Sequence, residues 1–175
     1  LLQEKIVEYK NTIKLMQSTG DRRFTRDSMI LYGRPSQKLI DIAEKLKHTV
    51  AEDEKTKVNT EQMVIQLRRA LERFGFDWNI KTRDMPAWAC VTHKERALLL
   101  KKDHDFPQKT IKRLIVHEIG THILRAENGA RQPYKIFNLG LKGFLKTEEG
   151  LAVLSEEINN CLCAKTLKSY AGRVI

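Results

Sequence analysis

Two histidines and a glutamate lie close together in the segment RLIVHEIGTHILR, at His117, Glu118 and His122. Histidine is a common zinc ligand, and a glutamate beside such a ligand can take a proton from an attacking water. In the usual motif the histidines are four residues apart, about 400° of helical rotation, so both face one metal. Here they are five apart, so we predict a one-residue π-bulge, which Gly120 would tolerate best.

A third ligand is needed, because a catalytic zinc site usually has three protein ligands and one open position. We expect Glu149, in the segment TEEGLA, since it follows a connection long enough to reverse the chain. Glu118 points about 100° away from its neighbour on a helix, which suits a base better than a ligand. The alternative is an ordinary surface helix with two histidines and a glutamate, and TEEGLA favours the metal site.

The elements before this motif are predicted to be helices. Apolar residues recur at helical spacing from residue 1 to about 17. Ser36 can cap a second helix, and Asn59 or Thr60 a third, which Gly75 ends. Between Trp78 and Lys102, the runs WACVTH and RALLLKK predict a small antiparallel sheet.

The motif itself should lie on a helix that Phe106 and Pro107 open and Gly129 ends. Residues 130–146 are predicted to form a loop, and Thr147 to cap a final helix. Glu148 and Glu149 would then lie in the first turn of that helix. Its inward-facing residues would be Leu151, Leu154, Ile158 and Leu162.

Length and composition favour one α+β domain over residues 1–175, cut from a longer chain, with a helical part (1–77) and a sheet with metal-binding helices (78–175). No apolar run is long enough to insert into a membrane. The net charge of +10 indicates an acidic partner, and the scattered basic residues do not resemble a module for specific nucleic acids. The three cysteines are an odd number, and the close spacing of Cys161 and Cys163 on a helical pattern does not resemble a disulfide framework, so they indicate the cytoplasm.

The chain resembles the microtubule-associated tyrosine carboxypeptidase family, the zincin-like tubulin detyrosinases whose bacterial relatives are named for a QEGLA motif. Three segments carry the resemblance: FTRDSMILYGRP (24–35), LIVHEIGTHILRAENGARQP (114–133) and TEEGLA (147–152). The six-residue HEIGTH is itself a mark of this family. The resemblance implies a zincin-like fold with an active-site helix that carries HEIGTH. It also implies that His117, His122 and Glu149 bind zinc and that Glu118 is the catalytic residue.

The family's activity would be removal of a C-terminal tyrosine from acidic tails such as that of α-tubulin, on microtubules, and the charge of +10 suits such a substrate. Arg125 is the first candidate to hold the substrate carboxylate, with Asn128 and Arg131 close behind and Tyr134 a weak candidate donor. Alternatively, Arg125 pairs with a nearby acid and Asn128 ends the helix.

Substrate could bind along ACVTH, as an added strand at a sheet edge. Three other functions stay open. The chain could be a noncatalytic basic module that binds acidic tails, a zinc peptidase of different specificity, or, on charge alone, a nucleic-acid binder.

Overall fold

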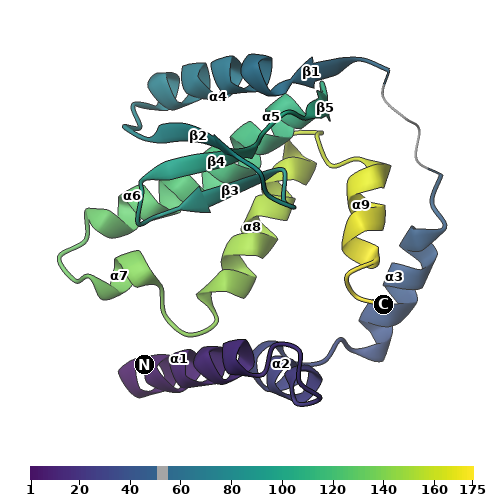
Figure 1. Ribbon diagram of the computed structural model, residues 1–175, viewed down its shortest axis with the longest axis vertical. Coiled ribbons are helices and arrows are strands. Elements are labelled where there is room, and N and C mark those ends of the chain that lie inside the picture. Colours follow the sequence, from purple (N-terminus) through teal and green to yellow (C-terminus); the bar gives the residue numbers. More distant parts are fainter. Residues whose placement is uncertain (51–54) are drawn as a thin grey trace. The chain divides into compact units, whose positions relative to one another are not determined.

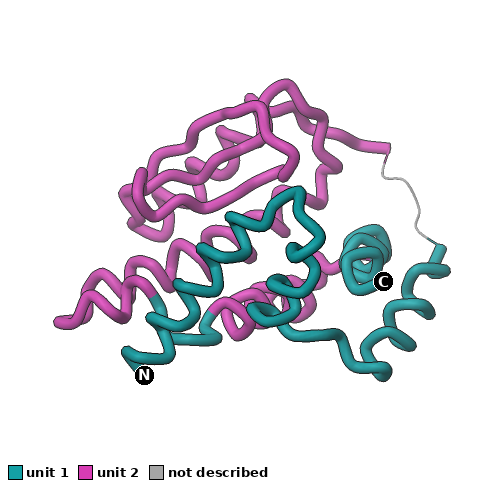
Figure 2. Tube along the Cα trace, turned by 60° about the horizontal axis from the view of Figure 1, so that its bottom comes forward, with its two compact units in different colours: residues 1–50, 140–144, 164–175 teal, residues 51–139, 145–163 magenta. Residues whose placement is uncertain are grey.

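The computed structural model describes residues 1–50 and 55–175, and their fold is α+β, as the sequence predicts (Figure 1). The chain divides into two compact units, shown in Figure 2. Unit 1 comprises residues 1–50, 140–144 and 164–175, and unit 2 comprises residues 51–139 and 145–163. His117, Glu118, His122 and Glu149 all belong to unit 2.

Unit 1 is helical. Its helices are α1 (Leu2–Gln17), α2 (Phe24–Tyr32), α3 (Gln37–Lys47) and α9 (Ala164–Ala171), with α1 packed on α2 and α3 on α9. Both α1 and the Ser36 cap of α3 confirm predictions, since the Ser36 side chain accepts a hydrogen bond from the backbone of Leu39. Helices α2 and α9 were not predicted from the sequence. The N-cap residue of α2, Arg23, makes no side-chain cap hydrogen bond, so the usual helix-start residue is missing there.

Unit 2 begins with β1 (Lys57–Asn59) and α4 (Thr60–Phe74). Asn59 and Gln62 form a capping box, which satisfies two backbone groups at the start of α4. Gly75 ends the helix in the left-handed conformation, with φ 70°, which a residue without Cβ adopts without strain. The predicted boundaries of this helix are therefore confirmed.

The main sheet has three strands in the order β2–β4–β3, namely β2 (Asn79–Arg83), β4 (Ala97–Lys101) and β3 (Ala89–Thr92). Strands β3 and β4 are antiparallel, but β2 and β4 are parallel, so the prediction of an antiparallel sheet is wrong for β2. The physical reason is that the chain reverses between β2 and β3 and again between β3 and β4, so β4 runs in the same direction as β2. The apolar strand β4, with Leu98 and Leu100 at 0% exposure, takes the central position and therefore pairs with β2 in parallel.

A second, two-stranded sheet corrects another prediction. Phe106 and Pro107 do not open a helix, because β5 (Asp105–Pro107) pairs antiparallel with β1. Phe106 is fully buried and packs edge-to-face on Trp88 and His104, and this packing overrides the helix-start signal of the proline. The next helix, α5 (Thr110–Leu114), starts three residues later.

From α5 the chain runs on through the π-helix η1 (Ile115–Ile123) and α6 (Leu124–Ala130). Leu98 and Leu100 point to one face of the sheet, because they are two residues apart on a strand. The core joins them to buried residues of α4, α5, η1 and α6, so these helices cover that face (Figure 1). The sheet and α4 thus hold η1 in place.

Gly129 lies inside the last turn of α6 and does not end it. Its role is spatial, since α7 (Ile136–Leu139) passes so close that an added Cβ would lie 2.6 Å from the carbonyl oxygen of Phe137. The short helix α7 also corrects the prediction of a loop over residues 130–146, as does α8 (Phe144–Ile158). Thr147 therefore lies within α8 and does not cap it.

The inward face of α8 was also mispredicted. Leu151, Leu154 and Ile158 are 53%, 47% and 70% exposed, and Leu162 lies beyond the helix and is half-buried. The buried residues are instead Glu148, Ala152 and Glu156. The spacing of the apolar residues gave a wrong prediction, because the side chains of α8 that contact η1 are the carboxylates of Glu148 and Glu156.

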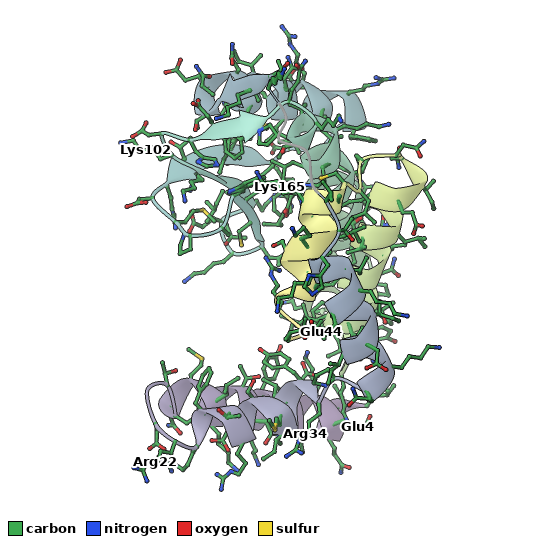
Figure 3. The ribbon with its side chains drawn as sticks, turned by 90° about the vertical axis from the view of Figure 1, so that its right-hand side faces the viewer. Glu4, Arg22, Arg34, Glu44, Lys102 and Lys165 are labelled. Carbon is green, nitrogen blue, oxygen red and sulfur yellow. The ribbon has the colours of Figure 1, made fainter. Side chains whose placement is uncertain are left out.

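Basic side chains occur on both units. Figure 3 shows Arg22 and Arg34, which flank α2, and Lys102, which follows β4. Among the residues that the structure describes, no helix combines the length and the apolar character needed to cross a bilayer.

Candidate metal centre

The predicted π-bulge is present and extends over the nine residues of η1. In a π-helix the hydrogen bonds join residues five apart, so His117 and His122 lie one above the other. Their ring centroids are 5.1 Å apart. The space around Gly120 would also admit a side chain, because a Cβ there would lie 3.5 Å from the carbonyl oxygen of Ile115, which is an ordinary contact.

His117, His122 and Glu149 come together as the sequence analysis predicts. One ligand atom of each lies within 4.8 Å of the others. The Nε2 atoms of His117 and His122 are 3.9 and 3.7 Å from carboxylate oxygens of Glu149. Two imidazole nitrogens and one carboxylate oxygen are a donor set that suits zinc and leaves a fourth position open. The Glu149 side chain is 59% exposed, so solvent reaches this group.

The other ring nitrogens of both histidines contact buried carboxylates of α8. His117 Nδ1 lies 2.7 Å from Glu156 Oε1, and His122 Nδ1 lies 2.9 Å from Glu148 Oε1. Helix α8, which lies beside the α5–η1–α6 helix, therefore supplies Glu149 and both of these carboxylates (Figure 1). Both rings are held with Nε2 towards Glu149.

The charges of His122 and Glu148 support each other. Burial alone would lower the pKa of His122, but the hydrogen bond to Glu148 and the nearby carboxylates outweigh it and raise this pKa. Burial alone would raise the pKa of Glu148, but hydrogen bonds from His122 and Arg125 lower it overall. Glu148 is therefore held as a carboxylate beside the ring.

Glu118 is buried, at 9% exposure, on the same π-helix. Burial raises the pKa of Glu118, and the neighbouring His117, His122 and Arg113 oppose this increase. A carboxylate with a raised pKa is a stronger base, and this property suits a group that must accept a proton near neutral pH.

Arg125 lies beside the metal-binding group, with contacts from all three guanidinium nitrogens. Its Nε donates to Glu148 Oε1 at 3.1 Å, and its Nη1 donates to the carbonyl oxygen of Asn138 at 2.8 Å. Its Nη2 lies 3.0 Å from His93 Nε2, in the turn between β3 and β4. Arg125 thus links this turn to the carboxylate that contacts His122.

Asn128, Arg131 and Tyr134 are exposed. Arg131 is the C-cap of α6, and the backbone oxygen of Asn128 accepts a hydrogen bond from Gln132. These contacts belong to the end of the helix and do not join the three residues to His117 or His122. Their role in substrate binding stays a prediction.

The edge strand β3 passes close to this group. Its outer edge pairs with no strand of the described residues. Burial and then the negative charges of Glu118 and Glu149 raise the pKa of Cys90, at the middle of β3. Among the described residues, a strand edge without a strand partner therefore lies next to the predicted zinc ligands.

Sequence reasoning missed Glu148, Glu156, Arg113 and His93 as parts of this arrangement. The two glutamates are eight residues apart, and with Ala152 they follow a four-residue helical spacing. That spacing is the one sequence feature that could have indicated a shared buried face. Glutamates on a solvated helix face can have the same spacing, so the spacing alone could not have identified the buried pair.

Comparison with known protein families shows a match over the whole chain. The family model of the microtubule-associated tyrosine carboxypeptidases matches residues 1–175, the whole chain. No curated protein and no solved structure shows significant similarity to it.

Proposed function

Because the chain belongs to the microtubule-associated tyrosine carboxypeptidase family, we propose that it is a zinc metallocarboxypeptidase. Its substrate would be an acidic polypeptide tail, such as that of α-tubulin, from which it removes a C-terminal aromatic residue, tyrosine. One observation carries the proposal. The donor atoms of His117, His122 and Glu149 lie within 4.8 Å of one another, next to the buried Glu118.

In this proposal His117, His122 and Glu149 hold a single zinc ion. When bound, zinc would polarise the carbonyl of the scissile peptide bond and make a water molecule more acidic. The exposure of Glu149 favours a catalytic over a structural site, because a structural zinc is closed by four protein ligands.

Glu118 would act as the general base and then as the general acid. Its carboxylate accepts a proton from the attacking water and later donates it to the leaving amine nitrogen. Burial raises its pKa and keeps it out of bulk water, so both transfers are favoured. Glu118 would not be a zinc ligand, and this separates its role from that of His117, His122 and Glu149.

The substrate tail would lie along β3. In its antiparallel ladder with β4, Trp88 accepts a hydrogen bond from Lys101, so hydrogen-bonded and non-hydrogen-bonded pairs alternate from there. By this alternation the backbone groups of Ala89 and Val91 point to the free edge. They can pair with an extended peptide.

The net charge of +10 would attract acidic tails. Arg125, Asn128 and Arg131 remain the proposed contacts for the substrate carboxylate, with Arg125 already holding Glu148 and His93. We also infer from the family that the protein works in the cytoplasm, on microtubules.

The test is cleavage of peptides that end in Glu-Glu-Tyr by the zinc-loaded protein, followed by mass spectrometry. We expect loss of one tyrosine, and no loss from the same peptide with an amidated C-terminus. Glu118→Gln should bind zinc but lose activity, whereas the same change at the exposed Glu157 should have little effect.

The same experiment distinguishes the alternatives. The charge of +10 also fits a noncatalytic module that binds acidic tails. Binding of the peptide without cleavage by the zinc-loaded protein would favour that module. Cleavage of other C-terminal residues, but not tyrosine, would indicate a zinc peptidase of different specificity.

A further inference from the structure

The buried face of α8 contains two carboxylates that contact the two histidines of the metal-binding group. We propose that Glu148 and Glu156 are positioning residues, which fix the tautomer and the ring orientation of His122 and His117. This inference rests on the proposed zinc site.

The tautomer follows from the chemistry of the contacts. An ionised carboxylate can only accept hydrogen bonds, so the nitrogen that contacts it must carry the proton. Glu156 contacts Nδ1 of His117 at 2.7 Å, so the tautomer with its proton on Nδ1 fits this contact, and in that tautomer Nε2 keeps its lone pair. The same holds for Glu148 and His122, at 2.9 Å. Both lone pairs are then available on the side that faces Glu149.

Each carboxylate is also charge-compensated by an arginine. Glu156 has 0% exposure and lies 3.4 Å from Arg113, and Glu148 has 6% exposure and lies 3.1 Å from Arg125. Burying a carboxylate is costly unless it is paired and hydrogen-bonded, and each arginine supplies such a partner. Two Arg–Glu–His chains of similar construction therefore end at the two histidines.

One helix positions both rings. His117 pairs with the later glutamate of α8 and His122 with the earlier one, so α8 runs antiparallel to η1. Glu148, Ala152 and Glu156 lie four residues apart on one face of α8, and all three are buried. The proposed ligand Glu149 is thereby placed by the same contacts that orient the histidines.

The first test measures zinc affinity by competition with a chromophoric chelator. Glu156→Leu and Glu148→Leu should each weaken zinc binding by about 10- to 100-fold. The Gln variants keep an acceptor oxygen but lose the charge, so they should lie between the wild type and the Leu variants. Glu157→Gln, an exposed change on the same helix, should bind like the wild type. Unchanged affinity in both Leu variants, or equal losses in the Glu157 control, would overturn the proposal.

The second test reads the tautomers by ¹⁵N NMR of the zinc-free protein at alkaline pH. The proposal expects the proton on Nδ1 of both histidines in the wild type and in the Gln variants. In each Leu variant, the ring that has lost its partner should give up this preference, while the other ring keeps it. A proton on Nε2 in the wild type, or tautomers unchanged in the Leu variants, would refute the assignment.

The two tests also separate this inference from the proposed function. A wild-type protein that binds no zinc would refute the zinc peptidase, and the tautomers would still decide whether the glutamates position the rings. A wild-type protein that binds zinc as tightly as both Leu variants would leave the zinc site standing and refute the positioning role. The Gln variants serve if a Leu variant fails to fold.

Discussion

Adding one methyl group at Gly129 should destabilise the protein, while the same change at Gly150 should stabilise it. Both glycines lie in helices without positive φ, so alanine should gain up to about 1 kcal/mol of helix propensity at either site. The two sites differ in the space available for an added Cβ. A Cβ at Gly129 would lie 2.6 Å from the carbonyl oxygen of Phe137, and at Gly150 nothing lies within 4 Å.

The magnitude follows from this contact. The Gly129 Cβ would be about 0.8 Å short of an ordinary contact, and the opposing atom is backbone, so α7 itself must move. Overpacking of this kind costs about 1–3 kcal/mol, which exceeds the gain in helix propensity. We therefore expect Gly129→Ala to lower the free energy of unfolding by up to about 2 kcal/mol. Gly150→Ala should raise it by about 0.5–1 kcal/mol.

The movement of α7 in Gly129→Ala should also affect the metal-binding group. The carbonyl oxygen of Asn138, in α7, accepts a hydrogen bond from Arg125, which in turn holds Glu148. Movement of α7 should therefore weaken zinc binding in Gly129→Ala but not in Gly150→Ala. Urea unfolding and chelator competition, run on both variants in parallel, measure the two effects. Equal or greater stability of Gly129→Ala would refute the reasoning.

Three further predictions concern other parts of unit 2. Val91→Pro removes a backbone N–H donor from the free edge of β3, so the KM for tail peptides should rise. Val91→Ala keeps this donor and should change the KM little. Equal KM values for the two variants would exclude binding along β3. The Thr60 hydroxyl donates its one proton to the carbonyl oxygen of Lys101 or of His104 and accepts a hydrogen bond from the backbone N–H of His104. Thr60→Val leaves these groups without their partner, so it should lower the free energy of unfolding, measured in urea, by about 1–3 kcal/mol, and no change would contradict this. Zinc at 100 times its Kd should raise Tm by about 5–11 °C, and His117→Ala should abolish this rise in a thermal melt; a Tm that does not respond to zinc in the wild type would exclude a native zinc site.

The predictions from sequence that succeeded depended on local chemistry. The caps Ser36 and Asn59 and the left-handed Gly75 define helix ends through their own backbone contacts, so they can be read without knowledge of the fold. The five-residue spacing of His117 and His122 predicted a π-bulge for the same reason. Two ligands of one metal must share a face, and only a distorted helix allows this at that spacing.

The predictions that failed depended on contacts between distant parts of the chain. Phe106 was assigned to a helix start, but its burial against Trp88 makes it part of a strand. The parallel pairing of β2 with β4 likewise depends on which strand becomes central. For α8, apolar residues indicated one face and the buried carboxylates Glu148 and Glu156 identify another. Their partners lie on η1, 26 and 39 residues away, and no local pattern reveals such pairing.

The π-helix uncouples the spacing of the histidines from the hydrophobic core. A π-bulge takes up one extra residue, and the helix on either side of it keeps its phase. Deleting Gly120 together with the bulge would therefore restore the ordinary four-residue spacing and leave the buried Ile123 and Ala126 facing the core. A one-residue insertion or deletion between the histidines can thus be absorbed within η1, without changes in α6. A search for zinc peptidases by the four-residue spacing would pass over this chain.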